Sequence, residues 1–144
     1  MILPVLQDCK PARMIHFNED QERSVKNFNL LTTKPVLYAA NVSEEFLGLK
    51  DNHHVQKLKE LALKENAGVV KVSGKIEAEL SQLQESEAAE FLKELGLAES
   101  SLDRLIQSGY ELLNLITFIT IKPPELRAWT IKKDTTALDA AGVI

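Results

Sequence analysis

Hydrophobic residues follow two different spacings along the 144-residue chain, and the spacing changes near Leu115. Before that point, apolar residues at helical spacing alternate with short, continuous apolar runs, which is typical of helices between buried parallel strands. After it, residues 116–121 and 126–131 alternate between apolar and polar on either side of Pro123-Pro124, which predicts an antiparallel hairpin. The pattern therefore predicts an α/β region followed by a β-rich module.

The α/β region contains a strand, a helix and a second strand. Residues 36–40 form a continuous apolar run after Lys34-Pro35, which ends any preceding helix, and the run predicts a strand buried on both faces. Apolar residues of 53–65 recur at helical spacing, and the run 68–72 predicts the second strand. We expect these elements to form a βαβ unit with parallel strands.

Three further helices are expected. Asn18 is suited to cap a helix over 19–31, residues 85–95 form a helix before Gly96, and Ser100 or Ser101 caps a helix that runs to about residue 113. The first residues enter an apolar pattern without a helix cap, and the last residues, 140–144, read as the start of another strand. Both ends of the chain therefore look cut. The apolar side of the first helix is expected to contain Val25, Phe28 and Leu31.

Composition limits the class of protein, the partners and the compartment that fit this chain. Hydrophobic residues make up 44%, which is typical of a soluble domain, and a chain of this length normally buries about two-thirds of its unfolded surface. The net charge of -4 argues against DNA as a partner of the whole chain. Cys9 is the only cysteine, which excludes an internal disulfide and favours a reduced, cytoplasmic setting. Apolar runs are too short for a membrane span, and residues 1–4 do not resemble a signal peptide.

Two loops are the candidate sites for chemistry, because ligands of open parallel sheets bind outside the carboxyl ends of the strands. Asn41-Val42-Ser43-Glu44 follows the first strand, where P-loop GTPases place an Asn-Lys-x-Asp loop that binds guanine. A glutamate in the last position, with no lysine in the second, fits guanine poorly and would relax or shift the base preference. Ser73-Gly74-Lys75 follows the second strand, and its glycine allows backbone to approach a ligand closely. Taken singly, the first loop also reads as an ordinary Asx-type strand exit and the second as an ordinary turn.

Other motifs carry no chemistry. Residues 68–75 resemble a Walker A motif, but five residues separate the two glycines where four are needed, and Ile76 replaces the Mg²⁺-binding Ser or Thr. His53-His54 is read as a surface pair, and the glutamates of 77–94 as a solvated helical face. We therefore assign no catalytic and no metal-binding residue.

Three longer stretches resemble the YchF/Obg-like ATPase family: residues 30–44, residues 90–97 followed by 104–115, and residues 127–131 followed by 140–144. The resemblance covers essentially the whole chain. It implies an α/β fold that is part of a P-loop NTPase, a parallel sheet with flanking helices, followed by the first strands of a β-grasp-like TGS domain. Residues 1–32 would be the returning end of a helical insertion, 33–114 the C-terminal half of the nucleotide-binding domain, and 115–144 a truncated TGS domain.

The resemblance also implies site residues, a cofactor and a partner. Asn41, Val42 and Glu44 would face the adenine of ATP, and Ser73-Gly74-Lys75 would close the base pocket. The whole protein would hydrolyse ATP with Mg²⁺ and associate with ribosomes in the cytoplasm, whereas this chain lacks the phosphate and Mg²⁺ ligands and is expected to be inactive alone.

The chain departs from the family at three positions. Lys75 stands where a small residue is common, and Asp134 and Leu138 replace an expected glycine and proline. Two other hypotheses remain open. One is a non-catalytic module that binds ribosome, RNA or protein, and the other is a chain that does not fold stably alone because its strands expose their edges.

Overall fold

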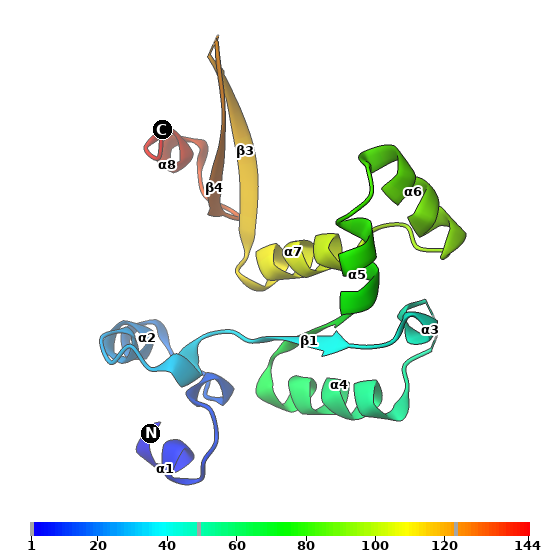
Figure 1. Ribbon diagram of the computed structural model, residues 1–144. Helices are drawn as coiled ribbons and strands as arrows, with labels where there is room; N and C mark the ends of the chain where they lie inside the picture. The colour runs from blue at the N-terminus through cyan, green and yellow to red at the C-terminus, as the bar shows by residue number, and fades with distance from the viewer. Residues whose placement is uncertain (1, 49, 123) are drawn as a thin grey trace.

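A pair of parallel strands lies at the centre of the α/β region in the computed structural model, which describes residues 2–48, 50–122 and 124–144 (Figure 1). β1 (Leu37–Asn41) pairs with β2 (Gly68–Val72), so that Leu37 lies opposite Gly68 and Asn41 opposite Val72. The ladder continues at both ends, because Gly68 N–H donates to the Val36 carbonyl at 2.9 Å and Val42 N–H donates to the Val72 carbonyl at 2.8 Å. The predicted parallel pair is confirmed, with β1 beginning one residue later than expected.

The expectation that β1 is buried on both faces is wrong. Its residues are half-buried or exposed, and among the strands of the described residues only β2 pairs with it. Of the residues in the two strands, Val70 alone is fully buried. A short apolar run indicates a strand, but burial on both faces also requires neighbouring elements that cover it.

Two helices lie on opposite sides of this strand pair. α4 (His53–Glu65) lies below β1 in Figure 1 and α7 (Ser101–Leu112) lies above it, and both contact the two strands. The side chain of Asn52 caps α4 by accepting a bond from the Val55 N–H, and Ser100 caps α7 by accepting one from the Asp103 N–H. α4 was predicted from its apolar spacing alone, without the Asn52 cap, and α7 from its serine cap and apolar residues.

The N-terminal segment contains α1 (Ile2–Gln7), η1 (Ala12–Met14), α2 (Glu19–Lys26) and η2 (Leu31–Thr33). Asn18 caps α2 as predicted and forms a capping box with Gln21. The predicted helix over 19–31 is too long, because the chain leaves the helix after Lys26 and Asn29 adopts a left-handed backbone with φ 48°. Phe28 and Leu31 are consequently exposed rather than part of an apolar helix side.

A cluster of three side chains ties this segment to the α/β region. One carboxylate oxygen of Glu65, on α4, accepts a bond from the Arg13 guanidinium at 2.6 Å and another from the Tyr38 hydroxyl at 2.9 Å. The Arg13 and Glu65 side chains are only 15% and 17% exposed. This low exposure makes the ion pair less screened by solvent than a surface pair.

Short helices occupy the two loops that follow β1 and β2. α3 (Glu44–Leu47) begins three residues after the end of β1, and α5 (Gly74–Leu80) begins two residues after β2. The sequence did not predict α3, and the helical face predicted over 77–94 includes only the second half of α5. α6 (Glu85–Glu94) confirms the predicted helix over 85–95, and Gly96 follows it with φ 69°.

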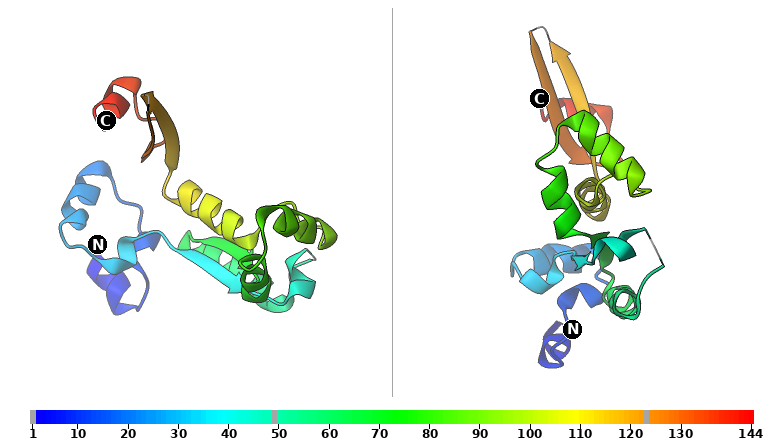
Figure 2. Two further views of the ribbon diagram at one scale, coloured as in Figure 1. Left: turned by 45° about the horizontal axis from the view of Figure 1, so that its top comes forward. Right: turned by 45° about the vertical axis from the view of Figure 1, so that its right-hand side comes forward.

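An antiparallel hairpin begins where the hydrophobic spacing changes. β3 (Leu115–Lys122) pairs with β4 (Glu125–Lys132), and it projects away from the end of α7 in the views of Figures 1 and 2. The predicted hairpin is confirmed. Pro123, part of the expected break, lies outside the described residues, as does Met1 at the start of the first predicted domain. The three domain assignments remain predictions.

The C-terminal residues differ from the expectation of a strand. Ala137–Ala141 form the helix α8, which Thr136 caps by accepting a bond from the Asp139 N–H. Alanine is the strongest helix former, and a Thr cap supplies a hydrogen bond to the first turn. Asp134, where the family resemblance expects glycine, has φ 68°, a left-handed conformation that glycine adopts without strain.

The core is small. Among the described residues, seven hydrophobic side chains are buried: Ala12, Val25, Leu47, Val55, Ala62, Val70 and Ile76. The accessible surface is 11008 Å², whereas a compact monomer of this mass exposes about 7,400 Å². The structure therefore buries about half of the unfolded surface, less than the two-thirds expected from length. Within the described parts of the chain, no helix is long and apolar enough to cross a bilayer.

Candidate functional site

The ends of β1 and β2 bring the two candidate loops together. Asn41 is the last residue of β1, and its side-chain oxygen accepts a hydrogen bond from the Gly74 N–H at 3.1 Å. Because parallel strands end at the same edge of a sheet, loops 31 to 33 residues apart in sequence become neighbours. In Figure 1 this edge lies where the arrowhead of β1 points towards α3.

An ion pair joins the same two loops a few residues further on. Lys75 Nζ lies 2.9 Å from Glu44 Oε2 and 4.0 Å from Glu79 Oε1. The hydrogen bond to Glu44, and then the charges of Glu44 and Glu79, raise the pKa of Lys75 above its usual value. Both partners stay accessible, since Lys75 is 66% and Glu44 45% exposed. A ligand in this region can therefore contact both side chains.

The two loops enclose a hollow of about 420 Å³. Five of the six predicted site residues line it, and the sixth, Gly74, joins the loops through its backbone. Ser43 and Glu45 also line it; both belong to the loop predicted after the first strand, but neither was assigned as a site residue. The lining residues are Asn41, Val42, Ser43, Glu44, Glu45, Ser73 and Lys75.

The first turn of α7 supports the second loop from behind. Ser73 is 1% exposed, and its N–H donates to the Ser101 hydroxyl at 3.4 Å. The Ser101 N–H in turn donates to Glu77 Oε1 at 2.7 Å. Glu77 is therefore not part of a purely solvated glutamate face, which corrects the expectation for 77–94. Within the described residues the Ser73 hydroxyl has no hydrogen-bond partner, so this wall of the hollow holds an unsatisfied polar group.

A Mg²⁺ ion does not fit the residues at this edge. Ile76, in the position where a Walker A motif has a hydroxyl, is 2% exposed and apolar, and the Glu44 carboxylate is already paired with an ammonium. No group of three His, Cys, Asp or Glu residues capable of holding a metal occurs among residues 2–48, 50–122 and 124–144. The rings of His53 and His54 lie edge to face with centroids 5.7 Å apart. We derive no step through Mg²⁺.

The hollow contains hydrogen-bonding groups of both kinds. Glu44 and Asn41 present acceptors and Lys75 presents donors, whereas the Ser73 hydroxyl is buried. This set can bind the polar edge of a planar ring. The side chains that line the hollow include no histidine or cysteine to serve as a base or nucleophile.

The strand pair, its flanking helices and the two joined loops define an α/β protein with a ligand-sized hollow at the carboxyl ends of parallel strands. Comparison with known proteins then identifies the family. The chain belongs to the YchF/Obg-like ATPase family. It is 48% identical over 136 residues to the ribosome-binding ATPase YchF of Bacillus subtilis, covering 94% of this chain and 37% of that protein.

Two further comparisons agree with this membership. The ribosome-binding ATPase YchF of Haemophilus influenzae is 42% identical over 143 residues, covering 99% of this chain and 39% of that protein. The solved structure of the Schizosaccharomyces pombe YchF GTPase superposes with a TM-score of 0.80 at 33% identity, covering 95% of this chain and 36% of that one. This chain therefore spans less than two-fifths of the length of these relatives.

A family model matches the hairpin and the residues after it. Residues 115–144 match YchF-GTPase_C, described as a protein of unknown function (DUF933). The match begins where β3 begins and includes α8. The change from α/β region to hairpin thus coincides with the start of a recognised family segment.

Proposed function

We propose that this chain forms the base-recognition end of an adenine-nucleotide-binding P-loop protein that acts at the ribosome. The observation that carries the proposal is the hollow formed by the Asn41–Glu44 and Ser73–Lys75 loops at the carboxyl ends of parallel strands. The names of the relatives, ribosome-binding ATPases, support the nucleotide, the partner and a cytoplasmic site of action.

The residues have different roles in the proposed complex. Asn41 holds the two loops at a fixed separation through the Gly74 N–H, and Glu44 accepts hydrogen bonds from the base. Ser73 and Gly74 form the wall against which a planar ring packs, with little side chain in the way. Val42 supplies an apolar contact for the face of the ring.

Phosphoryl transfer is not proposed for this chain alone. That reaction depends on a loop of backbone amides, a lysine and Mg²⁺ that position and stabilise the γ-phosphate. The sequence contains no Gly-x-x-x-x-Gly-Lys-Ser/Thr motif. The family's ATPase activity, and the Mg²⁺ it requires, are proposed to belong to the longer protein.

The experiment that tests the proposal is a titration of the isotope-labelled chain with AMP, ATP and GTP, followed by amide NMR. Binding at the hollow shifts the amide signals of residues 41–45 and 73–75 before those of the hairpin. The variant Glu44→Ala, which leaves the Asn41–Gly74 bond in place, is expected to weaken these shifts. Uniform small shifts across the chain, or shifts confined to other segments, would contradict the proposal.

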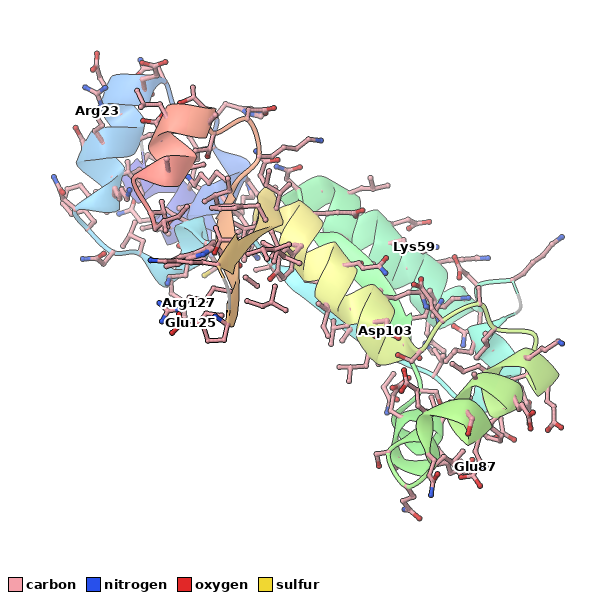
Figure 3. All side chains as sticks on the ribbon, turned by 90° about the horizontal axis from the view of Figure 1, so that it is seen from above. Arg23, Lys59, Glu87, Asp103, Glu125 and Arg127 are labelled. Carbon is pink, nitrogen blue, oxygen red and sulfur yellow. The ribbon has the colours of Figure 1, made fainter. Side chains whose placement is uncertain are left out.

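A second candidate function is a docking module, and the exposed apolar residues of the hairpin favour it. Ile119, Ile121 and Leu126 are at least 65% exposed, and Lys122, Glu125 and Arg127 lie beside them. Glu125 and Arg127, two positions apart on β4 and both labelled in Figure 3, form an ion pair at 3.0 Å. Salt-dependent cosedimentation of the chain with ribosomes in the absence of nucleotide tests this function.

A further inference from the structure

The ion pair between Lys75 and Glu44 lies directly in the proposed base-binding hollow. Both side chains line the hollow, and they come from different elements, α5 and α3. Lys75 Nζ contacts Glu44 Oε2, which leaves Oε1 of the same carboxylate with no partner in that pair. A free carboxylate would present two acceptors, whereas this pair presents a donor beside an acceptor.

We propose that Lys75 is a specificity-determining residue that, together with Glu44, selects adenine over guanine. The inference rests on the proposed function of the hollow as a base site. It assigns to Lys75 a role that differs from closing the pocket, namely to change which hydrogen-bonding pattern the site accepts.

The hydrogen-bonding edge of adenine matches the ion pair. Its exocyclic amino group is a donor and the neighbouring ring nitrogen N1 is an acceptor. The amino group donates to the Glu44 carboxylate, and Lys75 donates to N1. An ammonium has three N–H donors, so Lys75 can keep its bond to Glu44 and still reach the base. Glu79, at 4.0 Å, holds the ammonium on this side of α5.

Guanine fits the same pair less well. Its ring N1–H and exocyclic amine are two adjacent donors, which a free carboxylate accepts with both oxygens. With Lys75 on Oε2, one of these donors faces an ammonium instead of an acceptor. If guanine shifts so that its carbonyl oxygen meets Lys75, its amine is left without an acceptor, and an unpaired polar group lowers affinity.

The test compares AMP and GMP binding to the whole chain and to three variants, with dissociation constants measured from the amide shifts of residues 41–45 and 73–75. Lys75→Met keeps the length of the side chain and removes the donor, and Lys75→Arg restores a donor. Lys93→Met, at an exposed lysine in the last turn of α6, is the matched control. We expect Lys75→Met to lower the ratio of AMP affinity to GMP affinity about tenfold, because one charge-assisted hydrogen bond to the base is lost. Lys75→Arg and Lys93→Met are expected to preserve this ratio.

A third nucleotide tests directly whether Lys75 acts as a hydrogen-bond donor. The analogue 1-deaza-AMP lacks the N1 acceptor but keeps the amino group. It is expected to bind the unmodified chain several-fold more weakly than AMP does, and to bind Lys75→Met as well as AMP does. A residue that only maintained the fold would lower the affinity for all three nucleotides by the same factor.

Each outcome has a definite meaning. An unchanged AMP-to-GMP ratio in Lys75→Met, or an equal penalty for 1-deaza-AMP in both proteins, overturns the role of Lys75 and leaves the base site intact. Equal loss of AMP and GMP binding shows a structural role only and also overturns the inference. Absence of any site-specific shift with AMP in the unmodified chain overturns the proposed function itself, and the inference with it.

Discussion

The side-chain oxygen of Asn41 accepts a hydrogen bond from the backbone N–H of Gly74 at 3.1 Å, which ties the end of β1 to the start of α5. The bond crosses 33 residues of sequence. Together with the ion pair between Lys75 and Glu44, it joins the two loops that form the hollow. Asn41 therefore acts on the proposed site by positioning its walls.

Replacing Asn41 with alanine is expected to loosen the second loop. The Gly74 N–H loses its acceptor, which costs about 0.5–1.5 kcal/mol of stability and speeds hydrogen exchange at that amide. Asn41→Asp, which keeps an acceptor at the same position, is the control and should protect the amide. Hydrogen exchange followed by NMR provides the measurement. Equal exchange rates at Gly74 in Asn41→Ala and the unmodified chain would show that the bond does not form in solution.

Asn66 ends α4 in a left-handed conformation, with φ 54° and ψ 44°, and leads directly towards β2. Alanine in this conformation is strained by about 1–2 kcal/mol, whereas glycine is not. Asn66→Ala is therefore expected to lower the free energy of unfolding by about 1 kcal/mol, and Asn66→Gly to change it little. Urea denaturation of the three proteins measures this difference. A glycine variant less stable than the alanine variant would contradict the expectation.

Among the described residues Ile76 is the largest fully buried side chain, and it lies in α5, immediately after the Ser73–Lys75 loop. Ile76→Ala removes three buried carbon groups and leaves a cavity, which costs about 2–5 kcal/mol, whereas Ile76→Val costs about 0.5–1.5 kcal/mol. Because the core is small, we expect the alanine variant to be largely unfolded at room temperature. Circular dichroism and urea titration distinguish the two variants. Equal stability of the two would show that the side chain is not packed.

The ion pair of Glu65 predicts how stability depends on acid. The hydrogen bond from Arg13, and then that from Tyr38, lower the pKa of Glu65 below its usual 4.5. A carboxyl group whose pKa is lowered in the folded state stabilises the fold at pH values above 4.5, and this contribution is lost as the pH falls through the lowered pKa. We therefore expect the urea midpoint of the unmodified chain to fall as the pH is lowered below 4.5.

The variant Glu65→Gln isolates this contribution. It should be less stable at neutral pH, since Arg13 loses a charged partner, and its stability should fall less steeply in acid. Asp51 is the control, because bonds from Lys59 and Lys71 lower its pKa in the same direction at a separate place. Asp51→Asn should keep the part of the acid dependence that Glu65 provides. If the urea midpoints of Glu65→Gln and of the unmodified chain fall in parallel with pH, Glu65 is excluded as a source of the acid dependence.

Caps and apolar spacing predicted most elements, and the errors have identifiable causes. α4 was predicted from its apolar spacing and α7 from its serine cap and apolar residues, because these signals act within one or two turns. The helix over 19–31 was drawn too long because Phe28 and Leu31 have helical spacing but, in the structure, remain exposed. Residues 140–144 were read as a strand by their apolar content, although the Thr136 cap and alanines make a helix.

Sequence alone determined the nature of the candidate site: an Asn-x-x-Glu loop and a Ser-Gly-Lys loop, each after a strand, in a chain that resembles one ATPase family. Such features depend on neighbouring residues and on the order of elements. Only the tertiary structure decided that Glu44 is paired with Lys75, that Asn41 holds Gly74, and that Ser101 and Glu77 support Ser73 from behind. These contacts join residues 24 to 33 positions apart, and their partners follow from how the helices pack on the strands, which no local pattern encodes.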